Sequence, residues 1–271
     1  MDLLKNTKDV CNKNNIVPSR SKGQNFLVNE DIYNEIVDSA NLNKDDIVLE
    51  IGPGLGILTE KLAKKVKKVV AVELDDKLFK YLSAKIKTEN IGNVELINAD
   101  VIKIKVADYG LKTNDYKIVA NLPYNITSIF LRNFLTISPP QSMVLMLQKE
   151  VAERIVAAPP EMSILAISVQ YYANPRILTL VAKDNFWPQP EIDSAIIKID
   201  LKSEQDRGSV DKEKDFFRLV KIGFSSRRKM LKNNLMSGYK FSQEIANNKI
   251  KSAGLPEKVR AQELSLQDWQ K

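Results

Sequence analysis

The chain has 271 residues, of which 44% are hydrophobic and 28% charged, a composition typical of a globular protein rather than a disordered or fibrous one. It contains no histidine and a single cysteine, Cys11, which excludes an intrachain disulfide, a cysteine-rich zinc site and an imidazole general base. We therefore expect no metal site, and a chemistry that depends on carboxylates, amides, backbone groups or a cofactor.

The sequence offers no apolar run long enough to span a membrane, and residues 1–6 lack the pattern of a signal peptide. A cytoplasmic protein without membrane contact is expected. The formal charge of +7 is uneven, because residues 201–271 hold 16 of the 41 Lys+Arg but only 9 of the 34 Asp+Glu. On charge alone this segment either meets a polyanionic partner or has a solvated lysine-rich face.

Residues 1–22 are polar and without periodicity, which indicates a flexible N-terminal arm carrying a mobile Cys11 thiol. From there helical and strand patterns alternate, and Asn29 is placed to cap the first helix. Helices are expected at 31–40, 58–66, 77–86, 129–135 and 150–156, and strands at 47–51, 68–73, 94–98, 117–121 and 143–148. This alternation predicts an α/β, Rossmann-like domain with a mostly parallel sheet.

The rest of the chain changes character after one more helix, expected at 163–172, and two strands, expected at 177–181 and 194–201. Residues 200–210 are rich in charge and turn formers and indicate a linker. Beyond them the apolar spacing is helical, which predicts a small all-helical C-terminal domain. The expected organisation is a flexible arm over 1–22, an α/β domain over 23–201 and a helical domain over 202–271.

A glycine-rich loop follows the first expected strand and precedes a helix. Gly52, Gly54 and Gly56 allow the backbone to bend sharply and to approach a ligand at the carboxyl edge of the sheet. The dinucleotide fingerprint G-x-G-x-x-G would require glycine at position 57, which is Ile57. The spacing instead resembles motif I of S-adenosylmethionine-dependent methyltransferases, in which the loop holds the methionine part of the cofactor.

Two acidic residues follow the next strands. Glu73 is placed to accept hydrogen bonds from both ribose hydroxyls of a nucleoside, and Asp100 to meet the adenine amine of the same cofactor. Either carboxylate could instead cap the following helix. Nicotinamide-dependent enzymes share such a loop and acid, so these residues alone do not name the reaction.

Asn121-Leu122-Pro123-Tyr124 comes after the fourth strand, again at the carboxyl edge. Asparagine and proline are ordinary turn residues, which is one interpretation of this motif. The other is catalytic: the Asn121 amide oxygen and the Leu122 carbonyl accept hydrogen bonds from an adenine amine, localise its lone pair and aim it at a methyl group. Such catalysis needs only positioning and preset dipoles, and no histidine.

An adenine that leaves its stack to reach this motif loses a few kcal/mol, which stacking on an aromatic face offsets by about 1–3 kcal/mol per base. Tyr124 is one candidate face and Phe186 is the other. Aromatic residues are more often core residues than base platforms. Prolines around Phe186 indicate a loop and favour the functional interpretation.

At these residues the chain resembles the ribosomal RNA adenine N6-dimethyltransferase family, from about residue 22 to 267. The resemblance lies in residues 23–27, the glycine loop, residues 72–75, residues 121–126 and a Phe-x-Pro-x-Pro-x-x-x-Ser motif that starts at Phe186. It implies S-adenosylmethionine as cofactor. The cofactor contacts that it implies are Asn25, Leu27, Gly52, Gly54, Gly56, Glu73, Asp100 and Asn121.

Leu122 and the basic segment 224–235 are similar to the small-subunit branch, which dimethylates two adjacent adenosines near the 3′ end of 16S rRNA in small ribosomal subunit biogenesis. The resemblance implies phosphate binding by Arg227, Arg228, Lys229 and Lys232. The alternatives are a macrolide-resistance-type 23S rRNA methyltransferase and a non-catalytic RNA-binding assembly factor of the same fold. A monomer is expected.

Overall fold

The computed structural model describes residues 2–19, 23–123, 126–203 and 210–271. The chain divides into two compact units, one of Met1–Ala152 with Pro175–Leu201 and the other of Glu153–Asn174 with Lys202–Lys271. The expected boundary between residues 201 and 202 coincides with a change of unit. Residues 153–174, however, were expected in the α/β domain and belong to the helical unit instead.

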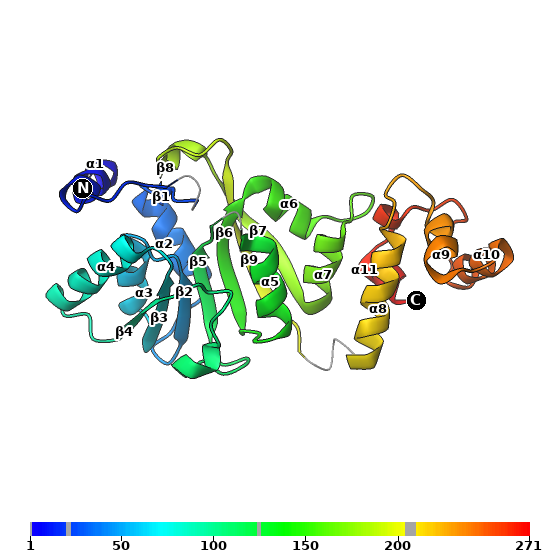
Figure 1. Ribbon diagram of the computed structural model, residues 1–271, viewed down its shortest axis with the longest axis horizontal. Helices are drawn as coiled ribbons and strands as arrows, with labels where there is room; N and C mark the ends of the chain where they lie inside the picture. The colour runs from blue at the N-terminus through cyan, green and yellow to red at the C-terminus, as the bar shows by residue number, and fades with distance from the viewer. Residues whose placement is uncertain (1, 20–22, 124–125, 204–209) are drawn as a thin grey trace. The chain divides into compact units, whose positions relative to one another are not determined.

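The first unit is built on a seven-stranded sheet with the order β4-β3-β2-β5-β6-β9-β7 (Figure 1). Strands β4, β3, β2, β5 and β6 run parallel, and β9 is antiparallel to β6. The strands are β2 (Ile47–Ile51), β3 (Lys68–Glu73), β4 (Val94–Asn98), β5 (Lys117–Asn121), β6 (Ser142–Gln148), β7 (Ala173–Val181) and β9 (Ser194–Leu201). The predicted Rossmann-like fold with a mostly parallel sheet is thus confirmed.

The central strands form because continuous apolar runs suit a sheet that is covered on both faces. Val48 and Val69 are fully buried and join Ile36 and Leu62 from two helices in one core cluster. The helices of this unit are α1 (Leu3–Lys13), α2 (Glu30–Ser39), α3 (Ile57–Ala63), α4 (Asp76–Thr88), α5 (Thr127–Thr136) and α6 (Lys149–Val156), which continues into the second unit. The Asn29 side chain accepts from the N–H groups of Asp31 and Ile32, which confirms it as the cap of α2.

The N-terminal segment differs from the flexible arm that its polarity indicated. Helix α1 is capped by Asp2, and Cys11 is only 1% exposed, packed with Ile16, Leu55 and Leu78. This packing shows that the prediction of a mobile thiol is wrong, and burial raises the pKa of the Cys11 thiol to about 11. The buried face uses Thr7 and Cys11, small side chains that contribute little to a hydrophobic pattern.

A two-stranded sheet that the sequence did not predict joins distant segments. Strand β1 (Phe26–Leu27) pairs antiparallel with β8 (Phe186–Trp187), with Phe26 opposite Trp187 and Leu27 opposite Phe186. Two residues are too few to show an alternating pattern. The pairing fixes the segment that precedes α2 beside the carboxyl edge of the large sheet.

The second unit is helical, as predicted for the C-terminal region. It contains α7 (Ile164–Tyr172), α8 (Val210–Gly223), α9 (Leu231–Tyr239), α10 (Gln243–Ser252) and α11 (Leu266–Gln270). Tyr171 of α7 packs on Phe216 and Phe217 of α8, with ring centroids 4.8 and 5.0 Å apart. This aromatic cluster explains why α7 belongs to the helical unit. Across the described residues of the whole chain, no helix is both long and apolar enough to cross a membrane.

Candidate active site

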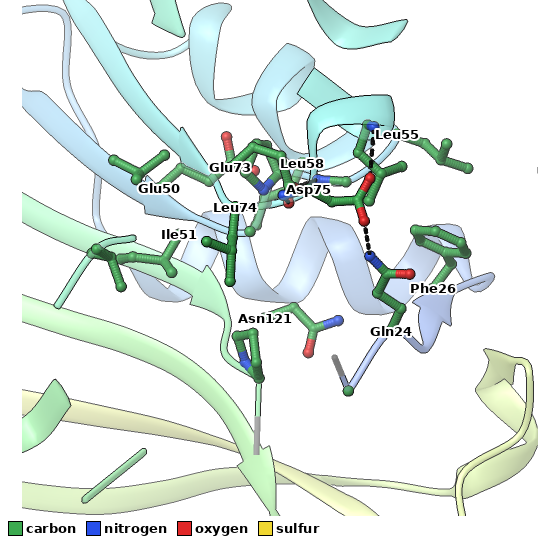
Figure 2. Close-up of a pocket in the computed structure, with 18 of the residues that line it drawn as sticks. Gln24, Phe26, Glu50, Ile51, Leu55, Leu58, Glu73, Leu74, Asp75 and Asn121 are labelled. Atoms are coloured by element: carbon green, nitrogen blue, oxygen red, sulfur yellow. Dashed lines mark hydrogen bonds between the residues drawn. The ribbon is translucent and has the colours of Figure 1, made fainter. Parts of the chain in front are cut away.

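A cavity of about 350 Å³ opens in the first unit where β2, β3, β4 and β5 end (Figure 2). Because these strands are parallel, their carboxyl ends meet at one edge of the sheet. Segments far apart in the sequence line this cavity. They are residues 23–27, 50–55, 57–58, 72–75 and 99–101, together with residues 33, 78, 121, 123 and 126.

The glycine loop adopts a backbone that requires glycine. Gly54 has φ +59°, and a Cβ atom there would lie 3.3 Å from the Phe26 ring. Gly56 has φ +82°, and a Cβ atom there would clash with the Leu82 side chain. Gly52 and Gly54 line the cavity, whereas Gly56 serves the close packing of α3 beside α4 and was expected among the cofactor contacts.

Glu73 ties the glycine loop to the end of β3. Its two carboxylate oxygens accept from the N–H groups of Gly54 at 3.1 Å and Asp75 at 2.9 Å. Burial raises the pKa of the Glu73 carboxyl, and the backbone donors partly oppose this shift. The carboxylate is therefore held in one orientation on the cavity wall, at the position predicted for a ribose contact.

Two other carboxylates on the wall also stabilise turns. Asp75 caps α4 and accepts from the Gln24 side-chain amide at 3.4 Å, as Figure 2 shows. Asp100 accepts from the N–H of Ile102 at 3.0 Å, so it stabilises the turn after β4 and does not cap a helix. Asp100 nevertheless lines the cavity, which leaves the predicted adenine contact open.

Glu50 is a site residue to which the sequence analysis assigned no role. Its side chain is 1% exposed and lines the cavity, and neither carboxylate oxygen has a hydrogen-bond partner among the described residues. Burial raises the pKa of the Glu50 carboxyl to about 8; the nearby Thr59 hydroxyl partly opposes this shift and the negative charge of Glu73 adds to it. An ionisable residue within the apolar run of β2 was the signal that could have identified it.

The charge of the cavity discriminates between ligand classes. Four carboxyl side chains line it, from Glu50, Glu73, Asp75 and Asp100, and the lining residues that the structure describes include no lysine or arginine. A pyrophosphate group would meet the carboxylates of Glu73, Asp75 and Asp100 and no basic side chain of the described lining, whereas a cationic ligand is attracted. The wall therefore favours a positively charged nucleoside over a dinucleotide.

Asn121, at the end of β5, points into this region (Figure 2). Its amide Nδ2 donates to the carbonyl of Asn25 at 3.5 Å, while no described residue donates to its Oδ1. Leu122 is buried and its N–H donates to the Met146 carbonyl at 3.1 Å, and Pro123 lines the cavity. Tyr124, the first candidate base platform, lies outside the described residues.

Phe186, the second candidate platform, is placed differently from what its flanking prolines indicated. It begins β8, is 4% exposed and packs in the core cluster that contains Leu27. Its ring is not part of the cavity wall. Pairing of β8 with β1 draws it inward, so in this conformation the ring presents no free face to a base.

The basic segment of the second unit precedes helix α9 rather than starting it. Arg227, Arg228 and Lys229 are exposed there, whereas α9 begins at Leu231. Lys232, predicted to bind phosphate with them, is 9% exposed and forms an ion pair with Glu257 at 2.5 Å. Burial and the carboxylate partner leave the Lys232 ammonium group less open to a phosphate than the side chains of residues 227–229.

Asn234 holds this basic segment in place and was missed by sequence reasoning. It is 2% exposed, and its Nδ2 donates to the carbonyls of Gly223 at 2.5 Å and Ser226 at 3.0 Å. One buried amide thus joins the end of α8 and the following turn to α9. Within the described parts of the chain, no group of three or more cysteine, aspartate or glutamate side chains could hold a metal ion.

A mostly parallel seven-stranded sheet, a glycine loop and a carboxylate-lined cavity at the carboxyl edge are the features expected of a Rossmann-like methyltransferase. The family model described as ribosomal RNA adenine dimethylase matches residues 18–271. The chain belongs to this family of ribosomal RNA methyltransferases.

Curated relatives cover nearly all of the chain. A protein named ribosomal RNA small subunit methyltransferase A from Dehalococcoides mccartyi (strain CBDB1) is 41% identical over 99% of this chain and 92% of its own. One of the same name from Clostridium botulinum (strain Kyoto / Type A2) is 39% identical over 98% and 96%.

Solved structures share the fold. A dimethyladenosine transferase from Plasmodium falciparum has a TM-score of 0.75 and 27% identity, covering 89% of this chain and 94% of its own. The 23S rRNA methyltransferase ErmE has a TM-score of 0.74 over 91% and 97%, and at 23% identity this likeness concerns the fold alone.

Proposed function

We propose that this protein transfers methyl groups from S-adenosylmethionine to the N6 amines of two adjacent adenosines near the 3′ end of 16S rRNA. Dimethylation of both would then be its part in small ribosomal subunit biogenesis. The observation that carries the proposal is Asn121, whose amide nitrogen is held by Asn25 while its oxygen stays available beside an acidic cavity. The names of the small-subunit relatives support the choice of substrate.

The residues of the cavity suit S-adenosylmethionine, which supplies an electrophilic methyl group on a positively charged sulfonium. Glu73 accepts from the ribose hydroxyls through the lone pairs that the backbone donors leave, and Asp100 accepts from the adenine amine. Asn25, Leu27, Gly52 and Gly54 belong to the same wall and contact the cofactor in this proposal. Glu50 faces the positive charge of the bound nucleoside, because a buried carboxylate is stabilised by a cation.

The target amine is positioned by the motif at the end of β5. Oδ1 of Asn121 and the carbonyl of Leu122 accept its two protons as hydrogen bonds, which localises the nitrogen lone pair. Groups preset in this way typically contribute about 10²–10³ in rate each. The target base stacks on Tyr124, and on Phe186 only after that ring becomes accessible.

RNA binding outside the cavity is assigned to Arg227, Arg228 and Lys229, which are exposed in one segment. Such phosphate contacts are independent of sequence and sensitive to salt. The protein acts as a monomer in this proposal, with the small ribosomal subunit as its partner.

The decisive test compares Asn121→Ala with the wild-type protein on purified ribosomal subunits and labelled S-adenosylmethionine. We expect RNA affinity within twofold of wild type but methyl transfer lowered by about 10² or more. Label on the large subunit instead of the small one would indicate the 23S alternative. Equal transfer by the variant would overturn the mechanism, and normal dimethylation of 16S rRNA in cells lacking the protein would overturn the substrate.

A further inference from the structure

Four side chains of the second unit form a continuous stack, which we call the cation–aromatic ladder: Arg218, Tyr239, Phe241 and Lys249. The Arg218 guanidinium lies 5.3 Å from the Tyr239 ring centroid, and the Lys249 ammonium lies 5.6 Å from that of Phe241. The two rings stack between these cations, 5.1 Å apart and 10° from parallel. The ladder connects α8, the C-terminal end of α9 and α10, which are drawn in yellow (α8) and orange (α9 and α10) in Figure 1.

Both cations of the ladder are open to an outside partner. Arg218 and Lys249 are exposed while the rings are half-buried, and neither cation forms an ion pair with any residue that the structure describes. Lys240 lies exposed between the two rings in sequence. By contrast, Lys232 and Lys271 of the same unit are paired with Glu257 and Asp268.

A cation that packs on an aromatic ring is held in position before an anion binds. Each contact is worth about 0.5–1 kcal/mol at an exposed site and restricts a side chain that would otherwise lose rotamer freedom on binding. Carboxylates, which would compete with an incoming phosphate, are absent from the ion-pair distance of both cations among the described residues. The ring edges between them offer an apolar surface for riboses or bases.

We propose that the cation–aromatic ladder is a second contact for the RNA backbone, separate from the segment of Arg227, Arg228 and Lys229. The two surfaces lie at opposite ends of α9, whose nine residues span about 14 Å. An RNA strand that follows this helix meets cations at both ends. The inference rests on the proposed function in taking RNA as the partner, and goes beyond it in assigning the surface.

The alternative is that the ladder only joins α8, α9 and α10 within the unit. Removing charge while keeping the rings and the side-chain stems separates the two roles. The test variant is Arg218→Gln with Lys249→Gln, and its charge-matched control is Lys251→Gln with Lys271→Gln. Lys251 is exposed on the same helix as Lys249, about 200° away around the helix axis.

The experiment measures the affinity of the full-length proteins for a small-subunit 3′-terminal RNA hairpin between 50 and 200 mM salt, as about this range resolves phosphate contacts. For the test variant we expect a slope of log affinity against log salt lower by about 1.4–1.8, for two lost contacts. Affinity should fall about tenfold at the lower salt concentrations, with an unchanged melting temperature. Exchanging the cations, Arg218→Lys with Lys249→Arg, should retain wild-type binding.

Three results would overturn the inference: a wild-type slope for the test variant, an equal loss in the control, or a loss in the charge-retaining exchange. Methyl transfer by the wild-type protein, measured on the same RNA, tests the proposed function independently of the ladder. If the wild-type protein methylates the RNA and the test variant binds it with wild-type affinity and slope, the ladder is rejected as an RNA contact while the proposed function stands. Absence of any wild-type RNA binding rejects both.

Discussion

The buried carboxyl of Glu50 makes the stability of the folded protein depend on pH. Its folded-state pKa of about 8 lies above the ordinary carboxyl value of 4.5, so the folded protein binds an extra proton between these two pH values. The contribution of the Glu50 carboxyl to the free energy of unfolding is complete below about pH 4.5 and is lost as the pH rises toward 8. Each unit of pKa difference corresponds to about 1.4 kcal/mol, which makes the loss a few kcal/mol.

We therefore predict that Glu50→Gln stabilises the cofactor-free protein at pH 8 much more than at pH 5. Glutamine keeps the size of the side chain and removes the buried charge. Urea unfolding at several pH values measures the difference. A constant difference between pH 5 and 8 would contradict the assignment, and Glu95→Gln, at a more exposed carboxylate in β4, is the control.

Phe186 poses a second question at the residue scale, because its ring is buried yet was expected to hold the target base. Phe186→Ala should lower the unfolding free energy by about 3–5 kcal/mol, and Phe186→Leu by less than half of that. If the ring also stacks on adenine, Phe186→Leu will lower kcat for RNA methylation at least tenfold with cofactor affinity unchanged. Calorimetry and single-turnover kinetics measure the two effects, and wild-type kcat in that variant would restrict Phe186 to the core.

At the scale of the elements, long periodic segments were predictable and short or polar ones were not. The five parallel strands and α2 to α5 follow from apolar periodicity and capping residues such as Asn29. Helix α1 was not predicted because its buried residues, Thr7 and Cys11, add little to a hydrophobic pattern. Strands β1 and β8 have two residues each, so they depend on tertiary pairing, which leaves no periodic signal.

In the candidate site too, local sequence patterns were predictable and tertiary contacts were not. Glycine spacing and strand-end acids placed Gly52, Gly54, Glu73 and Asp100 on the cavity wall, as their positions at strand ends required. The burial of Lys232 was not predicted, because a run of basic residues does not reveal that helix α9 begins at Leu231 and that this side chain pairs with Glu257. Where the first residue of a helix is unknown, the charge pattern does not reveal which of its side chains face inward.

The turn before α9 gives a prediction at the element scale. Asn234→Ala removes the amide that joins Gly223 and Ser226 and leaves their carbonyls without this donor. We expect a loss of about 1–3 kcal/mol in unfolding free energy and an RNA affinity several-fold lower, because residues 227–229 lose their fixed position. Cofactor affinity should stay unchanged. Asn233→Ala, at an exposed neighbour, is the matched control for equilibrium unfolding and RNA binding.

At the scale of the whole molecule, the carboxylate-lined cavity and the basic surfaces belong to different units. Every residue of the cavity wall falls within residues 23–126, whereas Arg227, Arg228, Lys229 and the cation–aromatic ladder all belong to the helical unit. The sequence indicated this division through the uneven charge. It did not indicate that α7 belongs to the helical unit, because a contact between Tyr171 and Phe216 is non-local and leaves no trace in either segment.

The membership of α7 leads to a prediction about truncation. A chain of residues 1–201 retains Tyr171 and Tyr172, which are 4% and 5% exposed in the full chain, but loses the rings of α8 that cover them. Each exposed ring adds roughly 150–250 Å² of apolar surface, so we expect this truncated chain to aggregate. Adding Tyr171→Gln and Tyr172→Gln should restore a soluble protein. Its cofactor affinity by calorimetry should match the full chain, since the cavity wall is intact, while RNA binding is lost. A soluble 1–201 chain without these changes would show that α7 does not depend on α8.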